Sequence, residues 1–318
     1  MLTHYPILFF KFDLIIYISI YISFIELINM SGQKSFIAKI EERILMMSKS
    51  DFMDSQDKIN DLLKERLNAD EKSPKSIFKS IDFKGTPLFT FGDKNAKRVI
   101  VFIHGGAFIN EINYQHHLFC LAISKKLDAY VIAPVYPLAP KHSCDETFGL
   151  MDDLYESLIS KMGKDQTISL IGDSAGGGFA LSFCQHLKAM DFPQPDNIVV
   201  YSPWVDIALS NPPYDNDSDP ILGEIGLREI GKSWAGDLDT QDYRVSPLFG
   251  DNSGLPRTLI FAGDNEIFYK DILKYNGKLK EDGVDARLIV GDGMFHIYPL
   301  FPSPEAWDAF KELEKEFE

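Results

Sequence analysis

The stretch G-D-S-A-G at residues 172–176 places one serine, Ser174, among small residues. The apolar run 167–171 precedes it and predicts a strand, and the small residues that follow suit the start of a helix. A sharp turn from strand to helix strains the serine backbone and leaves no space for neighbouring side chains, which explains the glycines. Such a turn raises a serine hydroxyl above the sheet, where it can act as a nucleophile. An ordinary glycine-rich connection has the same pattern, so the motif needs partners elsewhere in the chain.

A second glycine-rich turn follows the apolar run 99–103, where a histidine precedes Gly105 and Gly106. Acyl transfer needs hydrogen-bond donors at the place where a carbonyl oxygen becomes negative. Backbone amides in a loop without side chains can point there, and a helix start adds partial positive charge. We therefore predict an oxyanion hole made of the amides of Gly105, Gly106 and Ala175.

The general base is expected after the nucleophile in the chain order serine, acid, histidine. Of the seven histidines, only His186 and His296 follow Ser174. His186 lies within the helix that is predicted to begin at the serine, and it precedes every candidate acid. His296 comes shortly after the strand-like run 286–290, in a loop from which an imidazole can reach the serine. It is the predicted base.

The acid is expected in the loop after the strand-like run 258–262, which carries two carboxylates, Asp264 and Glu266. A spacing of three residues after Gly263 selects Glu266, and glutamate is an accepted third member of such triads. Asp264 remains the alternative, because a shift of the loop would bring it to the histidine.

The elements that must position these residues alternate along most of the chain. Eight apolar runs predict strands, and amphipathic patterns between and after them predict helices. The strands are expected at 77–83, 87–91, 99–103, 130–134, 167–171, 198–201, 258–262 and 286–290, and the helices at 115–127, 148–162, 175–187, 271–282 and 303–317. Strands this apolar are buried on both faces, so the pattern predicts an α/β fold with a mostly parallel central sheet flanked by helices.

Two regions depart from this alternation. Residues 31–76 contain two amphipathic helical patterns, which must pack on another part of the molecule. Residues 206–245 interrupt the series with a loop and a helix near 224–234. Such an excursion is expected over the carboxyl ends of the strands, where open α/β sheets bind ligands.

The composition argues against a nucleic-acid-binding protein and against a metal site. The chain has 318 residues, 45% hydrophobic and 25% charged, and its net charge of −15 argues against nucleic acid as a partner. Its three cysteines lack the spacing of a zinc site, which indicates a reducing compartment. The adjacent His116 and His117 are not four residues apart on one helix face, so no metal site is predicted there.

The first thirty residues are unusually apolar. The uncharged run 14–25 is shorter than the ~20 residues that span a bilayer. Three interpretations stay open: translation that begins at Met30 rather than Met1, a membrane anchor, or a folded segment. We predict a cytoplasmic protein, with membrane association through residues 1–30 as the alternative.

Five motifs occur in order: His104-Gly-Gly-Ala-Phe, Tyr136-Pro-Leu-Ala-Pro-Lys-His142, Gly172-Asp-Ser-Ala-Gly-Gly, Ser202-Pro-Trp-Val-Asp206 and Ser246-Pro-Leu-Phe. From about residue 77 to the end, the chain resembles the hormone-sensitive-lipase-like branch of the α/β-hydrolases. That branch includes carboxylesterases and arylacetamide and steryl deacetylases. Lys141 stands where the branch usually has glutamate, and Glu266-Ile-Phe stands where many relatives have Asp-Pro-Leu.

The resemblance implies an α/β-hydrolase fold without a cofactor. A catalytic domain of residues 77–205 and 246–318 would carry a helical cap made of residues 31–76 and 206–245. The function implied is a serine carboxylic-ester hydrolase acting on small, apolar, short-acyl esters. A ligand receptor without catalysis and a peptidase or amidase on the same fold are the alternatives, and a homodimer is left open. Candidate lining residues of the pocket, for each of which a place in the hydrophobic core is the favoured interpretation, are Phe108, Trp204, Tyr214, Trp234 and Phe301.

Overall fold

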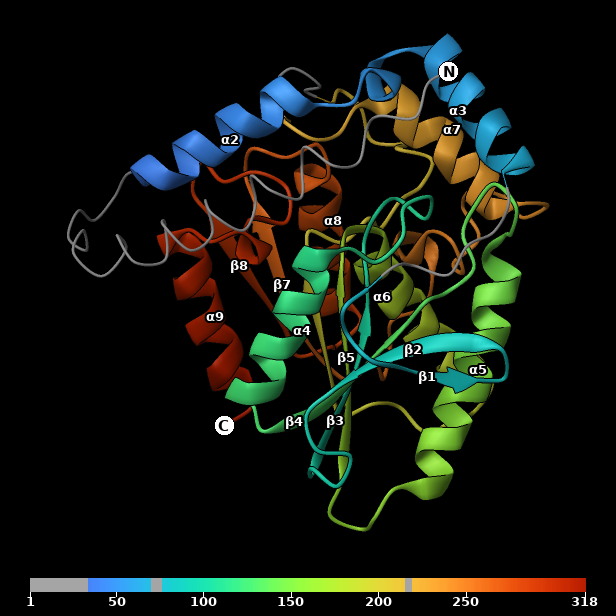
Figure 1. Cartoon of the computed structure of the whole chain (residues 1–318), viewed down its shortest axis with the longest axis vertical. Coiled ribbons are helices and arrows are strands. Elements are labelled where there is room, and N and C mark those ends of the chain that lie inside the picture. Colours follow the sequence, from blue (N-terminus) through green and yellow to red (C-terminus); the bar gives the residue numbers. More distant parts are fainter. Residues whose placement is uncertain (1–33, 70–75, 215–218) are drawn as a thin grey trace.

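The computed structural model describes residues 34–69, 76–214 and 219–318, so the apolar segment 1–30 lies outside the described residues. An eight-stranded sheet forms its centre, in the order β1-β2-β4-β3-β5-β6-β7-β8 (Figure 1). The strands are β1 (Ser80–Phe83), β2 (Thr86–Phe91), β3 (Arg98–Ile103), β4 (Ala129–Pro134), β5 (Thr167–Asp173), β6 (Asn197–Tyr201), β7 (Arg257–Gly263) and β8 (Ala286–Gly291).

The sheet is parallel from β4 to β8, and β1 and β2 are antiparallel to their neighbours. This confirms the predicted fold class. In a parallel sheet the carboxyl ends of the strands meet at one edge. The register pairs Ile103 with Gly172 and Gly263 with Gly291, so the loops after β3, β5, β7 and β8 begin side by side.

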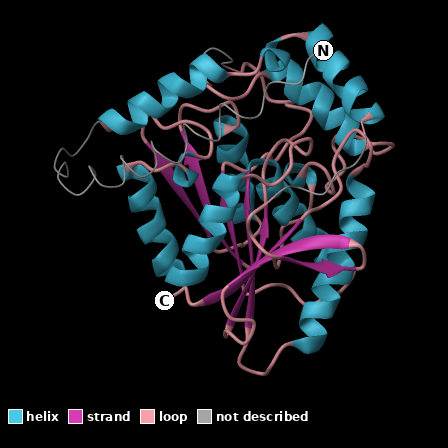
Figure 2. Ribbon diagram, viewed as in Figure 1, coloured by secondary structure: helices cyan, strands magenta, loops and turns pink. Residues whose placement is uncertain are grey.

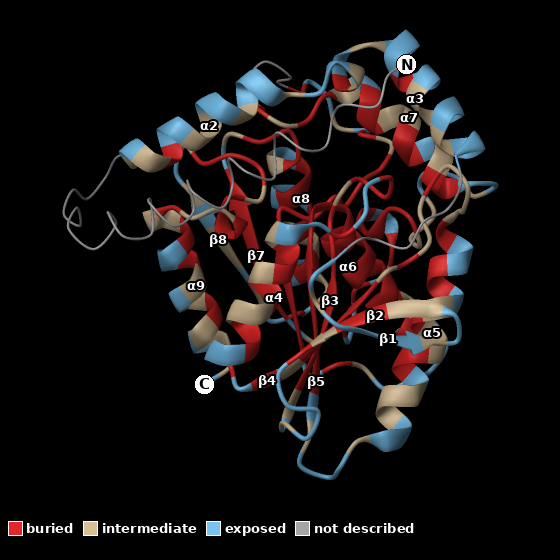
Figure 3. Ribbon diagram, in the orientation of Figure 1, coloured by how far each residue is buried: buried red, intermediate tan, exposed pale blue. Residues whose placement is uncertain are grey.

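Helices cover both faces of the sheet (Figure 2). On one face lie α4 (Tyr114–Lys126) and α9 (Pro304–Glu316), and on the other lie α5 (Cys144–Lys161), α6 (Ser174–Ala189) and α8 (Tyr269–Glu281). Each face buries a hydrophobic cluster between sheet and helices, and the central strands are buried along most of their length (Figure 3). The outer faces of the helices stay exposed, as amphipathic patterns require.

The remaining helices lie beyond the carboxyl edge of the sheet: α2 (Phe36–Ser48), α3 (Gln56–Asn68) and α7 (Glu224–Ala235) (Figure 1). A short 3-10 turn, η2 (Asp51–Asp54), joins α2 to α3 and was not predicted. It lies so close to α7 that a Cβ at Gly226 would be 2.8 Å from Met53 Cα. Only glycine permits this contact.

Two helices differ from their predicted form. Helix α5 begins at Cys144 rather than Phe148, because Ser143 and Glu146 form a capping box that extends it. Helix α2 leaves part of its apolar face uncovered, with Phe36 76% and Met47 85% exposed. None of the helices in the described ranges combines the length and apolar character needed to cross a bilayer.

Candidate active site

The turn from β5 into α6 presents Ser174 at the carboxyl edge of the sheet. Ser174 has a φ of 52°, a left-handed conformation that non-glycine residues adopt at an energetic cost. A Cβ at Gly176 would lie 2.1 Å from the carbonyl oxygen of Ile103, and one at Gly172 would lie 2.5 Å from that of Gly176. Both glycines are therefore required for α6 to begin so close to β3.

His296 and Glu266 meet Ser174 at this edge. The Nε2 atom of His296 lies 2.9 Å from Ser174 Oγ, and its Nδ1 atom lies 2.6 Å from Glu266 Oε2. A carboxylate only accepts hydrogen bonds, so the imidazole proton is on Nδ1 and the Nε2 lone pair faces the serine hydroxyl. The structure thus brings together the serine, histidine and glutamate that the sequence singled out.

The three side chains are almost completely buried, and their charges interact strongly. Burial raises the pKa of Glu266, while its hydrogen bond with His296 opposes that rise. Burial acts to lower the pKa of His296, but the hydrogen bond and charge of Glu266, with the charges of Asp219 and Asp173, outweigh it and raise the pKa. The surroundings of this imidazole therefore favour its protonated form.

Ser202 is a partner of this group for which sequence reasoning predicted no role. Its hydroxyl accepts the backbone N–H of Ile297 at 2.9 Å and forms a hydrogen bond with Glu266. A second donor, the Gly263 amide, reaches Glu266 Oε1 at 3.1 Å. Ser202 thus joins the acid to the residue after His296. The only sequence signal was its position directly after β6, as the first residue of the motif Ser202-Pro-Trp-Val-Asp206.

Asp264, the alternative acid, lies elsewhere. Its side chain is exposed, and its Oδ1 atom accepts the Gly293 amide at 2.6 Å. It stabilises the loop that leads to His296, whereas Glu266 makes the contact with the imidazole.

The loop after β3 corrects one predicted oxyanion donor. The Gly105 amide donates to Asp173 Oδ1 at 2.9 Å and is not free to bind another oxygen. Its assignment to the oxyanion hole is therefore wrong. The side chain before the nucleophile captures this amide, and a Cβ at Gly105 would lie 2.2 Å from Asp173 Oδ2.

The next amides of the loop remain available. Within the described chain, the N–H groups of Gly106, Ala107 and Ala175 have no hydrogen-bond acceptor. Gly106 has a φ of 117° and Ala107 a φ of 53°, so the backbone bends strongly here. Ala107 is a candidate donor that sequence reasoning missed, because its side chain gave no signal.

A second buried histidine–carboxylate contact lies under this loop. His116 Nε2 is 3.4 Å from Asp173 Oδ2, and His116 Nδ1 accepts the Asn113 amide at 3.1 Å. Burial acts to raise the pKa of Asp173, but His116 and the Gly105 amide outweigh it and lower the pKa. Burial lowers the pKa of the nearby His104 to about 3, so that imidazole is neutral.

Aromatic side chains extend from His296 toward α7. Phe268 packs edge-on against His296, Trp204 stacks on Phe268, and Phe108 lies between Trp204 and Trp234. Of the candidate lining residues, Phe108, Trp204 and Trp234 are buried in the core, as are Tyr214 nearby and, in part, Phe301.

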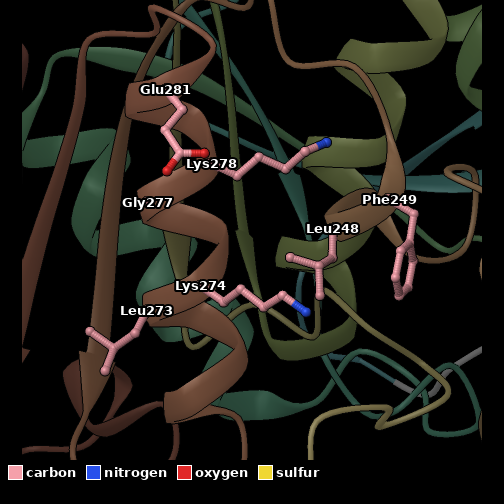
Figure 4. Close-up of a pocket in the computed structure, with 7 residues that line it drawn as sticks. All are labelled: Leu248, Phe249, Leu273, Lys274, Gly277, Lys278 and Glu281. Carbon is pink, nitrogen blue, oxygen red and sulfur yellow. The ribbon is translucent and has the colours of Figure 1, made fainter.

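One surface pocket lies away from this group. It has a volume of about 480 Å³ between α8 and the 3-10 turn η3 (Pro247–Phe249) (Figure 4). Its lining is Leu248, Phe249, Leu273, Lys274, Gly277, Lys278 and Glu281, without Ser174, Glu266 or His296. The pocket therefore belongs to another part of the surface.

Known proteins resemble both the sequence and the fold. A family model for the α/β-hydrolase fold matches residues 100–300. An esterase of Acinetobacter venetianus is 30% identical over 224 residues, 69% of this chain and 74% of that protein. The crystal structure of a candidate esterase of Staphylococcus aureus has a TM-score of 0.76 at 26% identity, over 83% of this chain and 93% of that one. A hormone-sensitive lipase from a metagenome library shares the fold, with a TM-score of 0.71 at 22% identity over 88% and 97% of the two chains.

Proposed function

Because the chain belongs to the α/β-hydrolase fold family, and within it to the enzymes of esterase and lipase type, we propose that it is a serine carboxylic-ester hydrolase with Ser174, His296 and Glu266 as its triad. The observation that carries the proposal is the pair of contacts at His296, 2.9 Å to the serine hydroxyl and 2.6 Å to the glutamate. Both distances lie within hydrogen-bond reach of a working nucleophile and base.

The reaction follows from this geometry. Ser174 Oγ attacks the ester carbonyl carbon as its proton moves to His296 Nε2, and Glu266 stabilises the imidazolium that forms. The new oxyanion lies at the amides of Gly106, Ala107 and Ala175. His296 then protonates the leaving alcohol, and an acyl-enzyme remains on Ser174. Water attacks that ester with His296 again as base, which releases the acid and restores the serine.

We also assign α2, α3 and α7 to a cap over the site. Two hydrogen bonds support this: α3 reaches the loop after β3 through Arg66 and Asn110 at 2.8 Å, and α2 reaches the acid loop through Glu42 and Asn265 at 3.0 Å. Ser174 is 5% exposed beneath these elements. A nucleophile so deeply covered, close to the aromatic side chains, suits a small apolar ester with a short acyl chain.

The test is hydrolysis of p-nitrophenyl esters of increasing acyl length by the parent and by Ser174→Ala. We expect the variant to lose on the order of 10⁵–10⁶ in kcat, because the nucleophile is absent. Ser182→Ala is the matched control: it is a buried serine of the same helix, and its Oγ has no hydrogen-bond partner in the described chain. It should keep the parental rate.

Equal rates for the parent and Ser174→Ala would remove the assignment. A matching panel of p-nitroanilide amides separates an esterase from a peptidase or amidase. We expect the esters to be cleaved far faster, and preferential cleavage of the amides would contradict the proposed reaction. A rate maximum at long acyl chains would contradict the proposed substrate size.

A further inference from the structure

The carboxylate of Asp219 is buried beside the acid loop and takes no part in the reaction described above. Asp219 is 1% exposed and lies in the excursion, residues 206–245. Its Oδ1 atom accepts the amides of Ile221 and Leu222, each at 2.8 Å. Its Oδ2 atom accepts the amide of Ile267 at 2.9 Å. Each oxygen therefore has a defined backbone partner.

The contact with Ile267 joins two parts of the chain that are far apart in sequence. Ile267 directly follows Glu266, so Asp219 fixes the backbone next to the triad acid. The other side of the acid is fixed by the Asn265 amide, which donates to the Met294 carbonyl at 2.9 Å. Glu266 itself accepts the Gly263 amide. Among these contacts, the one from Asp219 is the only one made by the excursion.

The charge of Asp219 also acts on the triad. It raises the pKa of Glu266 and the pKa of His296. The other charged groups that act on His296 are Glu266 and Asp173. The imidazole is thus surrounded by negative charge, which favours its protonated form when the serine gives up its proton.

We propose that Asp219 is a positioning residue of the hydrolase, which holds the acid loop through Ile267 and supplies a second negative charge behind the Glu266–His296 pair. The inference rests on the proposed function. It goes beyond the triad because it makes the excursion part of the catalytic apparatus: a residue of the predicted cap determines where the acid stands. The alternative is that Asp219 only stabilises its own turn at Ile221 and Leu222.

Asp206 provides a matched control. It is buried, lies in the same excursion and accepts the backbone amides of Ala208 and Ser210 at 3.0 and 2.8 Å. Among the described residues, the remaining hydrogen bond of its carboxylate is with the Ser210 hydroxyl. Asp206 therefore resembles Asp219 in burial and turn-forming role, but in the described part of the chain its carboxylate makes no hydrogen bond to the acid loop.

The experiment compares Asp219→Asn with Asp206→Asn in kcat and KM for a short-acyl p-nitrophenyl ester across pH. Asparagine keeps the size of Asp219, but one of its oxygens becomes an NH₂ group that cannot accept an amide. We expect kcat to fall between about 10- and 100-fold with little change in KM, because the acid is displaced and the substrate contacts remain. The acid limb of kcat/KM should move to lower pH, because the loss of a negative charge lowers the pKa of His296.

Asp206→Asn should leave the acid limb in place. A parental kcat in Asp219→Asn would overturn the proposal, and so would a loss of activity with an unmoved acid limb. If Asp219→Asn does not fold, Asp219→Glu takes its place: it keeps the charge but displaces the oxygens, so kcat should fall while the limb stays. A parental kcat in a folded Asp219→Glu would count against the inference.

Ser174→Ala in the same assay separates the two proposals. If it remains active, the proposed function fails. If it is inactive while Asp219→Asn behaves as the parent, only the role of Asp219 fails.

Discussion

In the described part of the chain, two buried histidine–carboxylate pairs lie at the turn between β5 and α6, and they differ in what the second imidazole nitrogen faces. In the His296–Glu266 pair, Nδ1 is bound to the carboxylate and Nε2 faces Ser174 Oγ. In the His116–Asp173 pair, Nε2 faces the carboxylate and Nδ1 accepts a backbone amide. The first imidazole has a lone pair directed at a hydroxyl, whereas the second has both nitrogens occupied.

A buried carboxylate beside a histidine is therefore insufficient to identify a base. His116 Nδ1 accepts the Asn113 amide and His116 Nε2 faces Asp173, so neither nitrogen is directed at a substrate or nucleophile. The pair instead fixes Asp173, which in turn holds the Gly105 amide. One pair is placed to carry out proton transfer, and the other supports the loop that we propose binds the oxyanion.

Substitution of the two histidines should have very different effects on activity. His296→Ala should lose on the order of 10⁵–10⁶ in kcat, because no other side chain in the described ranges forms a hydrogen bond with the serine hydroxyl. His116→Gln should lose no more than about 100-fold, since it only loosens the loop at Gly105. Steady-state kinetics with one short-acyl ester measures both. Similar losses in the two variants would mean that the pairs do not have separate roles.

The two candidate acids, Glu266 and Asp264, should respond differently to substitution by the corresponding amides. Glu266→Gln should lower kcat on the order of 10⁴-fold, because a neutral amide no longer fixes the imidazole proton or stabilises its charge. Without Glu266 the pKa of His296 falls, so the acid limb of kcat/KM, expected above pH 6.5 in the parent, should move to lower pH. Asp264→Asn, at the rejected acid, should keep both the rate and the limb.

Asp173→Asn should act mainly on stability. The asparagine has an NH₂ group in place of the oxygen that faces His116, and this group cannot accept the imidazole N–H. The buried hydrogen bond is therefore lost, at a cost of about 1–3 kcal/mol in the free energy of unfolding. The pKa of Asp173 is lowered in the folded state, so its stabilising effect is present above the ordinary value of 3.8 and is lost as pH falls through the folded value. Urea unfolding at pH 7 and pH 3 should therefore show a difference from the parent that shrinks in acid. A constant difference would contradict this interpretation.

The sequence predicted most of what local pattern determines. Apolar runs located all eight strands, and chain order with strand position selected Ser174, His296 and Glu266. The strand positions and the proximity of these three side chains could be inferred because strand burial and the spacing of residues after a strand end are local properties. The 3-10 turn η2 was missed because a single turn carries no periodic signal.

The sequence could not predict which backbone amides form hydrogen bonds with side-chain carboxylates. The pattern marked Gly105 as a donor, and only the position of the Asp173 carboxylate shows that this amide is already bound. Ser202 contacts Glu266, and Asp219 accepts the amide of the next residue, Ile267; both come from segments far away in the chain, so no spacing reveals them. Ser202 lies in one of the motifs that carry the family resemblance, but the motif alone assigned it no role. The contacts of its hydroxyl with Glu266 and Ile297 indicate that it positions the acid.

A third histidine provides the mildest test of the comparison. His104 is buried and stacked on Tyr136 at 4.3 Å, and its Nδ1–H donates to the Gly105 carbonyl at 2.7 Å. Its Nε2 atom has no partner among the described residues, and its pKa is lowered to about 3. Between pH 6.5 and about pH 3, His104 is therefore protonated in the unfolded chain but neutral in the folded state. Stability should fall by up to about 1.4 kcal/mol per pH unit between those values.

His104→Phe keeps a ring against Tyr136 but cannot titrate. It loses the bond to the Gly105 carbonyl and also removes the unpaired Nε2, two effects that offset each other near neutral pH. Urea unfolding at pH 7, 6, 5 and 4 should show a shallower loss of stability in the variant than in the parent, while kcat changes little. If both proteins lose stability equally with acid, His104 is protonated in the folded state, and the inference that its buried imidazole is neutral is wrong.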